Sequence, residues 1–132
     1  MNEPVGTPVI LVVDEDVGFL WWLGELFHEA GFRSIPALNC QQALALSRTV
    51  PGGVDLLVIN PALTGVSGLI QSLTGAHPPK IVLIEEAGAA PIPGVQALAT
   101  LERPSGPEPV SRAEWRQKIA KILSQVGFRA AS

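Results

Sequence analysis

Five polar side chains lie within two residues of the ends of short apolar segments, which is where α/β proteins place their ligands. They are Asp14 and Glu15 after Val9–Val13, Asn60 after Asp55–Ile59, Glu85 after Lys80–Ile84, and Arg103 after Val95–Leu101. Crowded carboxylates are stable only when a cation or a basic side chain lies among them. A simpler interpretation of the first acids is structural, because acidic residues also favour the start of a helix and Asp16 can cap the next one.

The segment around Asn60 organises the rest of the chain. The continuous apolar run Leu56–Ile59 is typical of a central parallel strand that is covered on both faces. Pro61 cannot extend a central strand, so Asn60 must lie at its carboxyl end. The expected strands are Val9–Val13, Phe32–Pro36, Asp55–Ile59, Lys80–Ile84 and Val95–Leu101. The expected helices are Val17–Ala30, Cys40–Arg48 capped by Asn39, Ser67–Thr74, and Ser111 to Val126.

Strands that alternate with helices predict an α/β fold, a doubly wound parallel sheet with right-handed crossovers. The simplest five-stranded form is flavodoxin-like, with strand order 2-1-3-4-5 and a ligand crevice between the first and third strands. Two prolines in Ala87–Gly94 exclude a full fourth helix, which we expect to be short or missing. Residues 1–132 are expected to form a single domain.

Composition narrows the class of protein. The chain has 132 residues, of which 47% are hydrophobic and 16% charged, with a formal net charge of −3. The acidic balance argues against a nucleic-acid surface, and apolar runs such as Phe19–Leu23 are too short to span a membrane. The amino terminus has no signal-like region, and the single Cys40 excludes an internal disulfide. We therefore expect a cytoplasmic protein in which Cys40 is a buried small residue.

Three motifs resemble the receiver domain of bacterial two-component response regulators. They are ILVVDED (Ile10–Asp16), DLLVIN-P…G (Asp55–Gly65) and LERP (Leu101–Pro104), and the resemblance extends over about Val9–Val126. In that family an aspartate at the end of the third strand accepts a phosphoryl group from a histidine kinase. A pair of acids after the first strand holds Mg²⁺, and a Thr or Ser and a Lys contact the phosphoryl oxygens.

This chain departs from the family at the residues that carry out the phosphoryl transfer. Asp14 and Glu15 match the acidic pair, but Asn60 replaces the acceptor aspartate, and an amide oxygen is a far weaker nucleophile than a carboxylate. Glu85, at or beside the Thr/Ser position, would repel phosphoryl oxygens. Arg103 replaces the Lys and can fork onto carboxylates. We expect a degenerate pocket in which Arg103 pairs with the acids; the alternative is an Arg103 that points to solvent.

The resemblance and its departures favour a non-enzymatic, phosphorylation-independent receiver-like domain that acts by binding another protein, such as a histidine kinase. No cofactor is expected beyond weak Mg²⁺ at Asp14 and Glu15. One alternative is a phosphorylatable receiver whose acceptor is Glu15 or Glu85. A second is a small flavodoxin-like enzyme or nucleotide binder, which the lack of a glycine-rich loop after the first strand disfavours.

The first helix provides a candidate interaction surface. Helical spacing places Phe19, Trp22, Leu23, Leu26 and Ala30 on one buried stripe. The residues left outside that stripe are Leu20, Trp21, Gly24 and His28, and we expect them to form an interface for a protein partner or a homodimer. The competing interpretation is that Trp21 completes the core beside Trp115.

Overall fold

Five strands form one parallel sheet in the order β2-β1-β3-β4-β5, as the sequence predicts. The computed structural model describes residues 8–50, 53–73, 78–85, 97–102 and 111–127. The strands are β1 Val9–Val13, β2 Arg33–Ala37, β3 Leu56–Ile59, β4 Lys80–Glu85 and β5 Ala99–Glu102. The helices are α1 Val17–Glu29, α2 Cys40–Ser47, α3 Val66–Leu73 and α4 Arg112–Val126.

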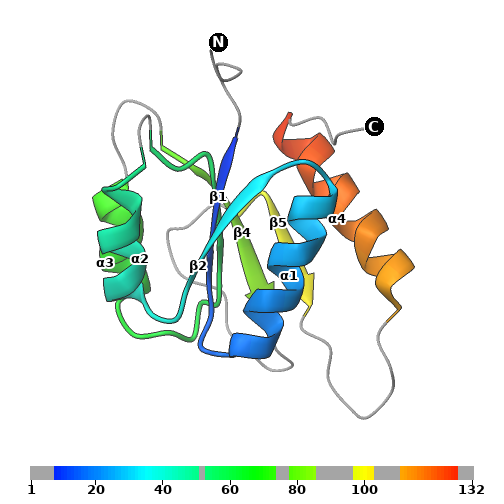
Figure 1. Cartoon of the computed structure of the whole chain (residues 1–132). Helices are drawn as coiled ribbons and strands as arrows, with labels where there is room; N and C mark the ends of the chain where they lie inside the picture. Colours follow the sequence, from blue (N-terminus) through cyan, green and yellow to red (C-terminus); the bar gives the residue numbers. More distant parts are fainter. Residues whose placement is uncertain (1–7, 51–52, 74–77, 86–96, 103–110, 128–132) are drawn as a thin grey trace.

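The helices cover the sheet in two layers, with α1 and α4 on one face and α2 and α3 on the other (Figure 1). Alternation along β1 sends Ile10 and Val12 into the core under α1 and α4, and Leu11 and Val13 into the core under α2 and α3. Both faces of the central strands are therefore buried, which explains why their sequences are continuous apolar runs. None of the described helices is both long enough and apolar enough to cross a bilayer.

The predicted helix caps are confirmed. Three side-chain oxygens accept a hydrogen bond from the backbone N–H three residues later: Asp16 from Phe19 at 3.1 Å, Asn39 from Gln42 at 2.7 Å, and Ser111 from Glu114 at 3.3 Å. Gly127 ends α4 in the left-handed conformation, with φ 92°. These caps satisfy backbone donors that would otherwise lack a partner at the helix ends.

Element boundaries differ from the prediction at several places. The second strand begins one residue later than expected, because the N–H of Phe32 still donates to the carbonyl of Phe27 near the end of α1, at 3.0 Å. The described part of the last strand begins at Ala99, although the N–H of Leu98 already donates to the carbonyl of Ile81 at 2.7 Å. The expected short or missing fourth helix falls on residues 86–96, which lie outside the described residues.

The buried face of α1 is wider than the predicted stripe. Leu20, which we expected to face outward, is buried with 4% exposure in the core, and Phe27 is fully buried. Trp22 and Ala30 are only partly buried at the margin of that core. Two rows of α1 side chains therefore pack in the core, Leu20–Leu23–Phe27 and Phe19–Leu23–Leu26. Together they form the broad apolar face that is typical of a helix packed on a sheet.

Candidate functional site

The structure brings Asp14 and Asn60 together at the carboxyl edge of the sheet. Val13 of β1 is paired with Ile59 of β3, so the next residues, Asp14 and Asn60, occupy adjacent positions. The N–H of Asn60 donates to the carbonyl of Val13 at 3.0 Å. Both side chains are buried, with exposures of 0% and 3%. Asp14 and Asn60 therefore meet at the strand ends where the topology predicts a ligand site.

The side chain of Asn60 is committed to the backbone of its own turn. Its Oδ1 accepts a hydrogen bond from the N–H of Ala62 at 2.9 Å. This bond determines the orientation of the amide, because the NH₂ group cannot accept a proton from Ala62. The amide oxygen is neutral and already engaged, and the amide nitrogen carries a delocalised lone pair. Asn60 therefore offers no nucleophile at this edge of the sheet.

The acids after β1 build the turn into α1. Asp14 Oδ1 accepts the N–H of Asp16 at 2.9 Å, and Asp16 in turn caps α1. Glu15, between them, is exposed to solvent. The capping role expected for Asp16 is thus confirmed, and one oxygen of Asp14 also serves the local backbone.

Glu85 and Arg103 were expected to complete the pocket. Glu85 is exposed at the end of β4, opposite Glu102 of β5 in the register. It borders a surface cavity of about 370 Å³ whose other charged residues include Lys118 and Lys121 of α4. Arg103 lies outside the described residues, so the ion cluster of Arg103 with the acids remains a prediction.

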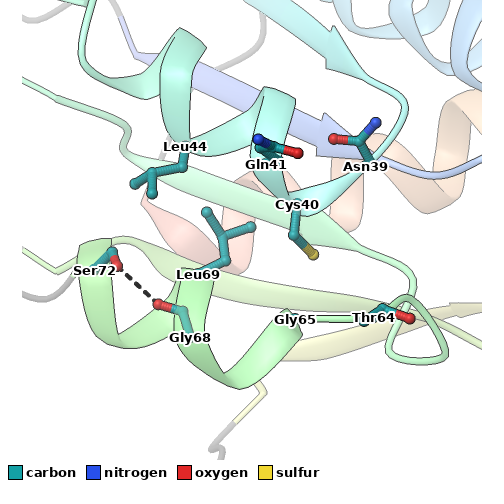
Figure 2. Close-up of a pocket in the computed structure, with 9 residues that line it drawn as sticks. All are labelled: Asn39, Cys40, Gln41, Leu44, Thr64, Gly65, Gly68, Leu69 and Ser72. Atoms are coloured by element: carbon teal, nitrogen blue, oxygen red, sulfur yellow. Dashed lines mark hydrogen bonds between the residues drawn. The ribbon is translucent and has the colours of Figure 1, made fainter.

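A groove between α2 and α3 was not anticipated from the sequence (Figure 2). Its volume is about 550 Å³, and its lining includes Cys40, Leu44 and Leu69. Cys40 is a free cysteine with 7% exposure, and burial raises the pKa of its thiol. The available signal was the spacing Gly65–Gly68–Ser72, because small residues at helical intervals leave open space on a helix face.

The surface of α1 differs from the edge of the sheet at Asp14 and Asn60, because large apolar side chains of α1 are exposed to solvent. Trp21 is 72% exposed, so the interpretation that it completes the core is wrong. It is Trp22 that contacts Trp115, with ring centroids 4.9 Å apart. Beside Trp21 lies a cavity of about 260 Å³ whose lining includes Leu20, Gly24 and His28. Three residues of the predicted interface therefore border the cavity with Trp21, and Leu20 does so from its buried position.

Comparison with known proteins identifies the fold. No protein-family model matches the chain, and no curated protein sequence matches it either. Solved structures do match. The chemotaxis response regulator CheY4 of Vibrio cholerae aligns with a TM-score of 0.65 at 17% identity, covering 92% of this chain and 99% of that one. The fold is that of response regulator receiver domains.

Two further neighbours have the same architecture. The signal receiver domain of an HD domain-containing protein from Pseudomonas fluorescens Pf-5 has a TM-score of 0.68 at 20% identity, covering 92% of this chain and 94% of that one. The receiver domain from the hybrid histidine kinase CckA has a TM-score of 0.59 at 18% identity, covering 87% and 98%. The doubly wound fold predicted from the sequence is thereby confirmed.

Proposed function

We propose that this chain is a receiver-like signalling domain that does not use phosphorylation and acts through contact with other proteins. The observation that carries the proposal is the state of Asn60. Its amide is buried beside Asp14, and its oxygen is held by the N–H of Ala62. Aspartyl-phosphate formation requires a carboxylate nucleophile at the strand end, and a neutral amide cannot supply one.

The decisive experiment is incubation with a small phosphodonor and Mg²⁺, followed by intact-mass measurement. We expect no mass gain, whereas a receiver with an aspartate at the equivalent strand end gains one phosphate under the same conditions. A phosphate that maps to Glu15 or Glu85 would overturn the proposal and support the phosphorylatable alternative. Both side chains are exposed, so a reactive carboxylate at either position would be accessible to the donor.

The isosteric variant Asn60→Asp tests whether a neutral side chain is favoured beside Asp14. It keeps the acceptor for Ala62 but adds a second buried carboxylate beside Asp14, and like charges in one buried site raise the pKa of one of them. A carboxyl group whose folded pKa is raised lowers stability at pH values above its unfolded pKa, near 4. We expect Asn60→Asp to lose about 1–3 kcal/mol at pH 7 and to approach the wild type at about pH 4. Equal stability at both pH values would contradict this.

Mg²⁺ binding at Asp14 and Glu15 is proposed to be weak. Mg²⁺ requires a near-octahedral set of oxygen ligands, usually with carboxylates. One oxygen of Asp14 and the amide oxygen of Asn60 already accept backbone N–H groups, and Glu15 points to solvent. A calorimetric titration should give a dissociation constant in the millimolar range. Micromolar affinity would show that the acids form a better site than this geometry supports.

A protein partner follows from the same proposal. Receiver folds act in signalling, and one neighbour is the receiver domain of a hybrid histidine kinase. We propose a signalling protein in the cytoplasm as the partner class and the α1 surface around Trp21 as the contact. Trp21 is the most exposed of the large hydrophobic residues in the described part of the chain, at 72%. Exposed aromatic residues of this kind are enriched at interface hot spots.

A further inference from the structure

Four residues lie along one line of α1, at intervals of four, three and four positions. They are Val17, Trp21, Gly24 and His28, which we call the α1 seam. Val17 is 63% exposed and Trp21 72% exposed. This spacing is that of a seam along which two helices pack side by side. Val17, Trp21 and His28 are exposed, and Gly24 is half-buried beside β2, so the contacts of α1 within the chain leave most of the seam available.

Gly24 forms a notch in the middle of the seam. A Cβ atom built at Gly24 would lie 3.5 Å from Ser34 Oγ, which is an ordinary van der Waals contact. Packing within the chain therefore does not require glycine here, although glycine is disfavoured inside a helix. The cavity beside the notch has a volume of about 260 Å³. That is below the usual ~300–1,000 Å³ of small-molecule sites, so a side chain is the better occupant.

The neighbouring edge of the sheet does not favour an added strand. The N–H of Asp14 donates to the carbonyl of Ala37, so alternation turns the backbone groups of Ser34 and Pro36 outward from β2. Pro36 has no N–H to donate, and proline at the edge of a sheet opposes strand addition. A partner on this side must therefore bind through side chains, and an α-helix is the element that fits a helical seam.

We propose that the partner is a second copy of this chain, bound through antiparallel packing of the two α1 seams about a two-fold axis. In this register Trp21 of each copy enters the notch at Gly24 of the other, and Val17 lies opposite His28. A two-fold interface must be complementary to itself, because each contact occurs twice. The seam meets this condition since its largest side chain and its smallest are symmetric about the seam's midpoint.

The charges at the two ends of the seam support the antiparallel arrangement. Glu15 and Asp16 precede the seam at the amino end of α1, whereas the exposed Arg33 follows its carboxyl end. Antiparallel packing places the acidic end of one copy against the basic end of the other. The remaining acids of α1 form ion pairs with α4: Glu25 with Arg112 at 3.4 Å, and Glu29 with Arg112 at 2.6 Å and Arg116 at 2.9 Å.

This proposal rests on the proposed function, in which the chain acts through protein contact, and it names the partner. The experiment that tests it does not involve phosphorylation. Sedimentation equilibrium of the whole chain, without phosphodonor, should show a monomer–dimer equilibrium below about 1 mM. Trp21→Ala and Gly24→Arg should each raise the dissociation constant at least about 30-fold, as expected for a hot spot. The control is Leu98→Ala, which truncates an exposed apolar residue beside the opposite edge strand. This variant should leave the dissociation constant of the dimer unchanged.

Mixing the two variants tests the register. One Trp21–Gly24 contact remains intact in a mixed pair, and the other contact places the new alanine opposite the new arginine, where space is available. An equimolar mixture should therefore dimerise more tightly than either variant alone. Circular dichroism checks that each variant is folded. If Gly24→Arg unfolds, Val17→Arg replaces it. This change brings a positive charge toward Arg33 at the carboxyl end of the opposing seam and should weaken the dimer.

Three results would overturn the inference. A chain that stays monomeric at every concentration excludes a second copy as the partner. This conclusion holds even if a histidine kinase is found to bind the same seam. A dimer that neither Trp21→Ala nor Gly24→Arg weakens lies on another surface. A mixture that fails to pair excludes the antiparallel register. A phosphate adduct on a chain that still dimerises through the seam would instead overturn the proposed function alone.

Discussion

The two helical layers on the sheet differ in how they are built. In the α1/α4 layer the helices have 13 and 15 residues, and the rings of Phe19, Trp22 and Trp115 have centroids 4.9–6.4 Å apart. In the α2/α3 layer both helices have 8 residues, and a groove of about 550 Å³ lies between them. Aromatic rings pack between α1 and α4, although a cavity of about 430 Å³ also borders Leu26 and Ile119 of these two helices. The described core under α2 and α3 has no aromatic side chain, and its groove is the larger of the two spaces.

This difference bears on where a binding surface is best placed. A site held by well-packed, regular elements has a more precise geometry than a site on loosely packed ones. The α1 seam belongs to the aromatic layer, where α1 is held by the core beneath it and by ion pairs with α4. The α2/α3 layer has the larger cavity, but short helices depend more on tertiary contacts for their stability. We therefore expect specific recognition at α1.

The largest effect should come from removing the central ring of the aromatic layer. Trp115 is 3% exposed and contacts both Phe19 and Trp22. Trp115→Ala should lower the free energy of unfolding by about 3–5 kcal/mol, because it leaves a cavity between α1 and α4. Urea denaturation measures this loss. Lys118→Ala, which removes a cation near the Trp115 ring, is the control and should cost under about 1 kcal/mol.

A smaller loss is expected from the equivalent truncation in the open layer. Leu69 of α3 is 3% exposed but borders the groove, so neighbouring groups and water can relax into the space that it leaves. Leu69→Ala should cost about 2 kcal/mol, the lower end of the range for buried leucine. Leu23→Ala in α1, whose side chain is fully buried, should cost distinctly more. Equal costs would show that the two layers are packed alike.

Two glycines beside the groove should respond in opposite directions. Gly65 has φ +89°, so Gly65→Ala introduces backbone strain of about 1–2 kcal/mol. Gly68 lies within α3, and a Cβ built there meets no atom within 4 Å. Gly68→Ala should therefore stabilise the chain by about 0.5–1 kcal/mol through helix propensity. A destabilising Gly68→Ala in the same melting experiment would mean that the groove is filled in solution.

The smallest effect concerns the ion pairs between α1 and α4. Hydrogen bonds from Arg116 and then Arg112 lower the pKa of Glu29 from 4.5 to about 2. A carboxyl group with a lowered folded pKa adds stability above its unfolded pKa, and that stability disappears as pH falls from about 4.5 to about 2. Glu29→Gln should thus lower the melting temperature slightly at pH 7 and not at pH 2. Solvent exposure and salt keep the difference small.

Local chemistry was enough to predict most of the fold. Continuous apolar runs indicated strands that are covered on both faces, and Asp16, Asn39 and Ser111 begin their helices as predicted. Pro61 placed Asn60 at a strand end, and the alternation of elements implied the strand order that the structure has. These features depend on residues close together in the chain, which is why the sequence alone was sufficient.

Tertiary structure decided how side chains are distributed between core and surface. Helical spacing could not tell that Leu20 is buried or that Trp22, not Trp21, meets Trp115, because the buried arc of α1 depends on how α1 and α4 meet. The cavity beside Gly24 likewise exists because β2 passes next to α1. Such contacts join segments whose separation in space no local pattern encodes.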